Sequence, residues 1–217
     1  MIIQNNQFPS NNKDCVLNIQ GIADTNDKSP SAHTVTNNGV TITTPANLNF
    51  NSMLFDGTSS LSVSHNTSFD FGTDDLTISG WVNFANTGTE IIATKRVDAN
   101  NYWHIYYAAG AIVFRFYVGG TWVGAYSAAF TPTINTWYHL GCSRSNLSVI
   151  KGIIAIDGIL LSVDEIVPFG TNNSNIPAAP IMIGNQTSLY FAGSMSNFMI
   201  HTQALYTRNF TPPNRIA

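Results

Sequence analysis

Apolar and polar residues alternate along much of the chain with a period of two, which predicts β-strands. The clearest example is the run from Leu76 to Phe84, Leu-Thr-Ile-Ser-Gly-Trp-Val-Asn-Phe, in which the apolar residues and the glycine would share one face. Its β-branched and aromatic residues favour a strand, and a tryptophan among the polar positions indicates that the second face is also covered. We therefore predict a central strand of a two-sheet sandwich at 76–84.

The rest of the chain repeats this pattern in short runs that are separated by turns. Residues 102–107, 111–117 and 121–126 predict a meander whose connections contain glycine. Asp157-Gly158 is the strongest hairpin signal, and Pro212-Pro213 argues against a terminal helix. No stretch keeps a helical period over three turns, so the pattern is typical of an all-β sandwich or barrel.

Nothing interrupts this pattern in the way that a linker would. We expect one domain, residues 14–217, preceded by a polar, asparagine-rich arm at residues 1–13. A chain of 217 residues is long enough for a single large all-β domain.

Composition excludes several function classes. Only 10% of the residues are charged and the net charge is −3, and no basic cluster exceeds Lys95-Arg96, so we do not expect nucleic-acid binding. The apolar run 153–161 is too short to cross a membrane, and residues 1–10 lack the pattern of a signal peptide. Cys15 and Cys142 lie in predicted strands, and without a secretion signal we interpret them as buried thiols rather than a disulfide.

Several short fragments between about Cys15 and Pro213 follow one another in a distinctive order. They are Leu54-Phe55-Asp56-Gly57, Phe69-Asp70-Phe71-Gly72, Leu76–Val82, Trp137-Tyr138-His139-Leu140, Ile156-Asp157-Gly158, Gly184 and Gly193. Their order resembles that of laminin-G-like domains, in the branch of the concanavalin A-like lectin/glucanase superfamily that is common in bacteria and phages. This resemblance implies a jelly-roll sandwich of two antiparallel sheets. The segments 29–35 and 198–213 resemble phage-encoded members.

Catalysis is not expected on this chain. Glycosidases with this fold carry carboxylates at alternate positions of one strand, where they act as nucleophile and general acid. The chain has two glutamates, Glu90 and Glu165, and neither has an acid two residues away. The adjacent pairs Asp74-Asp75 and Asp164-Glu165 would point to opposite faces of a strand. The five histidines show no ligand spacing, so we assign no catalytic residue.

Calcium is the one cofactor that the resemblance leaves open. Members of the family often hold a structural calcium ion between an aspartate of an early loop and one at the start of the last strand. Asp27, or Asp24, and Asp56 are the corresponding candidates here. The last strand reads Ser196-Asn197 where the family pattern favours two aspartates, and this change removes ligand charge. We favour turn-forming roles for Asp27 and Asp56.

Exposed aromatic rings are the usual partners of a sugar on this fold. Two predicted turns, 98–101 and 119–120, lie close in sequence to a group of aromatic and amide side chains. For each ring alone, packing inside the sandwich is the interpretation that we favour. The candidates for carbohydrate binding are Trp103, Tyr107, Trp122, Tyr126, Asn100 and Asn101.

Two functions fit these expectations. The first is a non-enzymatic structural protein of a phage, as capsid decoration or tail component, made in the host cytoplasm. Its partners would be other virion proteins, contacted through residues 1–13 and 207–217, with weak attachment to glycans and homo-oligomer formation as further options. The alternative is a carbohydrate-binding module or adhesin of a bacterium, at the cell surface or outside the cell. An enzyme with unfamiliar acids stays as a third option because fold does not decide function.

Overall fold

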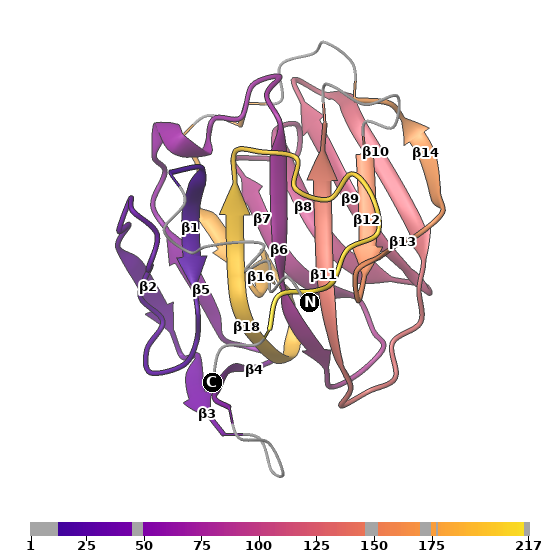
Figure 1. Cartoon of the computed structure of the whole chain (residues 1–217). Helices are drawn as coiled ribbons and strands as arrows, with labels where there is room; N and C mark the ends of the chain where they lie inside the picture. Colours follow the sequence, from indigo (N-terminus) through magenta and orange to yellow (C-terminus); the bar gives the residue numbers. More distant parts are fainter. Residues whose placement is uncertain (1–12, 45–49, 146–151, 170–174, 177, 215–217) are drawn as a thin grey trace, which may run out of the picture.

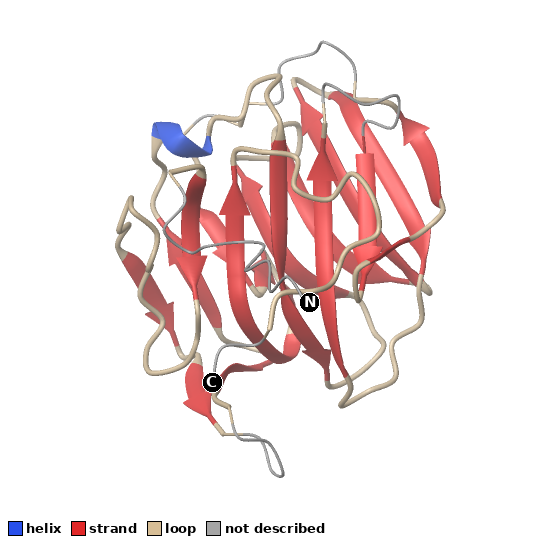
Figure 2. Cartoon of the chain, viewed as in Figure 1, coloured by secondary structure: helices blue, strands red, loops and turns tan. Residues whose placement is uncertain are grey.

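Two large antiparallel sheets pack face to face in the computed structural model (Figure 1). The structure describes residues 13–44, 50–145, 152–169, 175–176 and 178–214. Within them the sole helical piece is a 3-10 turn at Thr67–Phe69 (Figure 2). No helix among the described residues is long and apolar enough to cross a membrane. The predicted all-β sandwich is confirmed; of the predicted arm at 1–13, residues 1–12 lie outside the described residues.

The first sheet, which we call the β6 sheet, has the order β13-β12-β11-β6-β18-β4-β3, and β1 pairs with the end of β18. Its strands are β1 (Cys15–Ile19), β3 (Thr41–Thr43), β4 (Ser52–Asp56), β6 (Leu76–Phe84), β11 (Trp137–Arg144), β12 (Gly152–Ile156), β13 (Ile159–Leu160) and β18 (Ala192–His201).

The second sheet, which we call the β8 sheet, has the order β14-β10-β9-β8-β7-β15-β5-β2. A two-stranded hairpin of β16 (Asn185–Gln186) and β17 (Leu189–Tyr190) packs beside β7. The strands of this sheet are β2 (Val35–Asn38), β5 (Ser60–Val63), β7 (Glu90–Arg96), β8 (Tyr102–Ala108), β9 (Ala111–Val118), β10 (Thr121–Ala129), β14 (Val163–Val167) and β15 (Ile181–Ile183).

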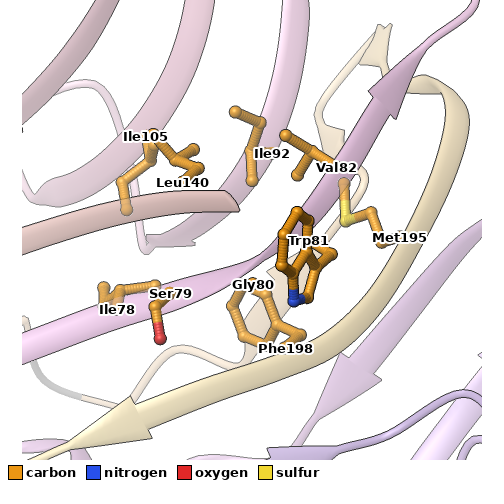
Figure 3. A pocket seen from close by; sticks show the side chains of 10 residues that line it. All are labelled: Ile78, Ser79, Gly80, Trp81, Val82, Ile92, Ile105, Leu140, Met195 and Phe198. Carbon is orange, nitrogen blue, oxygen red and sulfur yellow. The ribbon is translucent and has the colours of Figure 1, made fainter. Parts of the chain in front are cut away.

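Strand β6 is central, as its alternation predicted. It lies between β11 and β18, and its apolar side chains point into the core between the sheets. A small apolar cavity lies beside its middle, where Gly80 contributes no side chain (Figure 3). Because side chains of both sheets line this cavity, we assign it to the core. The lining residues are Ile78, Ser79, Gly80, Trp81, Val82, Ile92, Ile105, Leu140, Met195 and Phe198.

Some connections differ from the simplest interpretation of the sequence. The Asn38-Gly39 turn does not join a hairpin, because β2 belongs to the β8 sheet and β3 to the β6 sheet. The Asp157-Gly158 hairpin is confirmed between β12 and β13, with both turn residues at positive φ. After β13 the chain crosses to the β8 sheet as β14.

The two cysteines are buried and free, as predicted.

Two buried cations, one from each sheet, hold the loop that leads into β6. Lys95 of β7 places its Nζ 3.0 Å from Asp70 Oδ1 and 3.3 Å from the Phe69 carbonyl. Burial lowers the pKa of Lys95, and the Asp70 carboxylate opposes this effect. The guanidinium of Arg144, on β11, donates to the carbonyls of Phe71, Gly72 and Asp74. Lys95 thus points into the sandwich, whereas Arg96, the next residue, lies on the outer face of the β8 sheet.

Candidate functional site

Aromatic and cationic side chains gather on the outer face of the β8 sheet. In β8 the side chains of Trp103, Ile105 and Tyr107 point into the core, so their neighbours point outward. Strands β9 and β10 add further outward residues to the same face. The group, which we call the aromatic-arginine surface, is Tyr102, His104, Tyr106, Arg115, Tyr117, Trp122 and Arg96.

The strand register sets the first row of this surface. Tyr102 lies opposite Tyr117, and Tyr117 lies opposite Trp122 on the next strand. The ring centroids are 5.5 Å apart in the first pair and 4.6 Å apart in the second. Arg96 ends the row, with its guanidinium carbon 5.2 Å from the Tyr102 centroid. The row is therefore a continuous set of rings, of which Tyr117 and Trp122 are partly exposed.

A fixed guanidinium occupies the second row. Arg115 lies opposite His104 in the register and donates from Nε to His104 Nε2. Because Nε2 accepts, His104 carries its proton on Nδ1, which donates to Gln186 Oε1 over 3.0 Å. The Arg115 guanidinium carbon is also 5.0 Å from the Tyr106 centroid and 4.8 Å from the Trp122 centroid. Two rings and one imidazole therefore fix its position.

The surroundings of His104 keep its imidazole in one protonation state. Burial lowers the pKa of His104 to about 3, and the charge of Arg115 acts in the same direction. The imidazole is thus neutral near pH 7 and accepts a hydrogen bond. Within the described part of the chain, neither Arg115 nor Arg96 has a carboxylate within 4 Å. The surface is positive as well as aromatic.

The sequence-predicted aromatic residues divide between the two sides of the sheet. Trp122 lies on the aromatic-arginine surface. Trp103, Tyr107 and Tyr126 lie in the core, with 1%, 2% and 0% of their surfaces exposed. Tyr126 stacks on Phe169 and its hydroxyl accepts from the backbone N–H of that residue. A stacking surface needs exposed ring faces, so these three rings serve packing, the interpretation that we favoured for each of them.

The two predicted asparagines lie in a turn at the end of the first row. The turn residues 98–101 and 119–120 are hydrogen-bonded to each other, because Asn101 Oδ1 accepts from Gly119 N and the Asn100 carbonyl accepts from Gly120 N. The Asn101 amide nitrogen donates to Asp98. Asn100 is exposed, and its side-chain amide has no partner within the described residues. Of the two asparagines, Asn100 is therefore the one whose side-chain amide can bind a ligand at the end of the first row.

Sequence reasoning missed Tyr102, Tyr106, Tyr117 and Arg115. The available signal was Arg115 itself, because an arginine between two phenylalanines marks the outward positions of β9. Residues at even spacing from it share its face, and the register carries that face to β8 and β10. His104 and Gln186 could not be paired from sequence, because they are 82 residues apart and come from different strands.

The two candidate calcium ligands are held by their own loops. Asp27 is buried and its carboxylate accepts from the backbone N–H groups of Asn18, Ser29 and His33. Asp56 accepts from the backbone of Thr58 and from neighbouring groups, and these bonds lower its pKa to about 2. Both carboxylates have the turn-forming role that we favoured. Among the described residues no group of three or more histidine, cysteine, aspartate or glutamate side chains is placed to hold a metal ion.

The glutamates considered for catalysis are far from a paired arrangement. Glu90 is buried, and its Oε2 accepts from the backbone N–H of Ala192 over 2.7 Å. Burial raises the pKa of Glu90. Glu165 lies on the edge strand β14 and is exposed. Glu90 therefore stabilises the backbone at Ala192. No second acid lies beside it within the described part of the chain.

The outer face of the β6 sheet is covered by the chain itself. After β18, residues 202–214 cross in front of β18, β6 and β11 (Figure 1). Tyr206 and Phe210 stack with centroids 4.1 Å apart, and both meet the edge of His139. Trp81 Nε1 donates to the carbonyl of Pro213 over 3.2 Å. This segment accounts for the predicted cover over Trp81. Residues 207–209, 211 and 214 of the segment are exposed, so contact with neighbouring proteins through 207–217 stays a prediction.

Comparisons with known proteins agree with this architecture. The family model described as the concanavalin A-like lectin/glucanases superfamily matches residues 55–208. No curated protein matches the sequence. Among solved structures, the binding domain of Paraclostridial Mosquitocidal Protein 1 superposes with a TM-score of 0.64 at 19% identity, over 88% of this chain and 49% of that one. The botulinum neurotoxin serotype C1 binding domain gives 0.65 at 14% identity, over 88% and 49%.

A third solved structure is similar over nearly its whole length. Domain 4 of AbnA, an extracellular arabinanase from Geobacillus stearothermophilus, was solved in complex with arabinotriose. It superposes with a TM-score of 0.64 at 15% identity, over 88% of this chain and 93% of that one. The chain thus spans about half the length of the toxin binding domains and nearly all of this domain. At these identities the likeness concerns the fold.

Proposed function

The chain belongs to the concanavalin A-like lectin/glucanases superfamily, and from this premise we propose that it is a non-catalytic, lectin-like domain that binds carbohydrate on the aromatic-arginine surface. The observation that carries this proposal is the row Tyr102-Tyr117-Trp122 on the outer face of the β8 sheet, in which the rings of Tyr117 and Trp122 are partly exposed and the buried Tyr102 supports them.

The chemistry of such a row suits a sugar chain. One face of a pyranose is a set of C–H groups, which pack on an aromatic ring, while the hydroxyls need polar partners around it. Trp122 and Tyr117 offer partly exposed rings, and Tyr106 and Asn100 bring a hydroxyl and an amide to the same region. Neighbouring strands are about 4.8 Å apart, so rings on adjacent strands can contact consecutive sugar units.

The comparison with the arabinanase domain supports the same function. That domain has this fold over most of its length and was solved with an oligosaccharide bound. The absence of a paired acid beside Glu90 within the described residues favours binding over hydrolysis.

A glycan array tests this proposal directly. The wild-type protein should bind at least one group of glycans, and Trp122→Ala should lose that binding at an unchanged melting temperature. Trp137→Ala is the matched control, because it removes a partly exposed tryptophan from the other sheet. An array without any bound glycan, or equal binding by wild type and Trp122→Ala, would contradict the proposal.

We further propose that the domain is displayed on a virus particle, as the sequence led us to expect. The support is the resemblance of residues 198–213 to the ending of phage-encoded members. Mass spectrometry of banded particles from the source should find the chain in stoichiometric amounts. If the protein is instead free or on cells, the bacterial adhesin or carbohydrate-binding module takes its place.

A further inference from the structure

We propose that the aromatic-arginine surface selects acidic glycans, and that Arg115 binds the carboxylate of a uronic or sialic acid unit stacked beside it. This inference rests on the proposed function and names the substrate class of that site. A neutral sugar would need only the rings and the polar rim, so the two arginines are the feature to explain.

The arginines are not explained by the fold. The buried cations Lys95 and Arg144 each hold a loop through hydrogen bonds to carbonyls or a carboxylate. Arg115 has one hydrogen bond, from Nε to His104, and its Nη groups have no partner among the described residues. Arg96 contacts the Tyr102 ring, and its charge acts at longer range on Asp98 and His104. Among the described residues, neither arginine therefore forms an ion pair.

The position of Arg115 is prepared for a planar anion. His104 fixes the Nε edge, and the rings of Tyr106 and Trp122 lie 5.0 and 4.8 Å from the guanidinium carbon. The Nη edge is left for a ligand, and a guanidinium binds a carboxylate through two parallel hydrogen bonds. Because Arg115 is only partly exposed and is already ordered, little side-chain entropy is lost on binding.

The aromatic neighbours place the sugar ring beside this charge. Trp122 contacts both Arg115 and Tyr117, so a pyranose stacked on the first row would lie next to the guanidinium. In uronic and sialic acids the carboxylate is attached directly to the ring. The distance from a stacked ring to a bound carboxylate is therefore short in these sugars, as the arrangement requires.

The experiment uses the full chain on a glycan array before and after methyl esterification, which neutralises carboxylates and leaves sulfates charged. We expect binding to carboxylated glycans that drops at least tenfold after esterification. For a carboxylated glycan from the array, Arg115→Gln should weaken binding about tenfold or more. Binding should also weaken as sodium chloride rises from about 50 to about 500 mM.

Two control variants separate charge from geometry. Arg208→Gln removes the same charge from an exposed position on the segment over the β6 sheet and should leave binding unchanged. Arg115→Lys keeps the charge but not the planar pair of donors, and we expect it to recover only part of the affinity. Melting temperatures show whether each variant is folded.

The outcomes distinguish this inference from the proposed function. Equal binding to neutral glycans, a preference for sulfated glycans, or full binding by Arg115→Gln would overturn the selection of carboxylates while leaving carbohydrate binding intact. Absence of binding to every glycan would overturn both.

Discussion

The two outer faces of the sandwich are both aromatic, and they differ in what covers them. On the β6 sheet, Tyr206 and Phe210 stack beside His139, and Trp81 donates to the carbonyl of Pro213 in the covering segment. On the β8 sheet, Tyr117 and Trp122 are partly exposed, although Tyr102 is buried and the β16–β17 hairpin contributes Gln186 at one side.

The polar groups on the two faces differ in the same way. On the covered face, burial lowers the pKa of His139 and of His201 to about 4 for each, so both imidazoles are neutral near pH 7. The imidazole of His139 packs among the rings of Trp81, Tyr206 and Phe210. On the open face, Arg115 and Arg96 are partly exposed and have no carboxylate within 4 Å among the described residues. The number of aromatic residues on a face is thus a poor guide to how many of their rings are exposed. Under the proposed function, the partly exposed rings beside Arg115 are the ones that contact a ligand.

The largest expected effect is a loss of stability in acid. The folded-state pKa values of His104, His139 and His201 lie below the ordinary value near 6.5, so the unfolded chain takes up these protons first as the pH falls. Their contribution is complete above pH 6.5 and declines toward pH 4. Each contributes a slope of up to about 1.4 kcal/mol per pH unit. Urea unfolding at pH 7, 6, 5 and 4 measures the sum.

A variant of the covered face sharpens this test. The ring nitrogens of His139 have no hydrogen-bond partner among the described residues, so His139→Phe should fold and should show a smaller slope. An unchanged slope would mean that His139 does not titrate as its surroundings require.

A matched pair of tyrosines separates the two faces by what each deletion changes. Tyr206 is 1% exposed, and Tyr206→Ala should cost about 3 kcal/mol in the free energy of unfolding without weakening glycan binding. Tyr117 is partly exposed, so Tyr117→Ala should cost about 1 kcal/mol or less but reduce binding several-fold. Denaturant unfolding measures the free energy of unfolding of both variants, and glycan titration measures their affinity. If both substitutions lower mainly the stability, or both lower mainly the affinity, the distinction between the two faces is wrong.

A smaller effect is expected where the covering segment meets the sheet. A Cβ at Gly141 would lie 2.5 Å from Cε2 of Tyr206, so Gly141→Ala must displace the ring. We expect a loss of about 1–3 kcal/mol in stability. Near-ultraviolet circular dichroism should show the movement of the ring. A variant as stable as wild type would show that the segment is not packed as tightly on the β6 sheet.

The smallest expected effect concerns calcium, away from both faces. The carboxylates of Asp27 and Asp56 already accept hydrogen bonds within their own loops. Addition of calcium chloride, or of a chelator, should therefore leave the melting temperature within about 1 °C. A saturable rise with calcium would show that these aspartates serve a metal ion.

The sequence alone was sufficient for the fold class and for strand β6. Its alternation predicts the buried Leu76, Ile78, Val82 and Phe84, because one face of a strand in a sandwich must be apolar. The sequence was less informative about which strands pair with each other. The sequence cannot tell that β2 and β3, two residues apart, belong to opposite sheets.

The candidate site was predictable only in part, for a physical reason. In a strand the two faces differ by one position, and aromatic residues suit both the core and an outer surface. Trp122 was named with Trp103, Tyr107 and Tyr126, which lie on the buried side. The charge of Arg115 fixes the outward register, whereas its contacts with His104 and Gln186 depend on tertiary structure.

Hydroxyl-radical footprinting by mass spectrometry tests the central claim most directly, with and without a glycan that the array identifies. Without glycan, Trp122 and Tyr117 should be oxidised and Tyr206 should be protected. With glycan, Trp122 and Tyr117 should become protected while Trp137, on the other sheet, stays unchanged. Protection of Trp137 instead, or free oxidation of Tyr206, would show that the covered and the open face have been assigned the wrong way round.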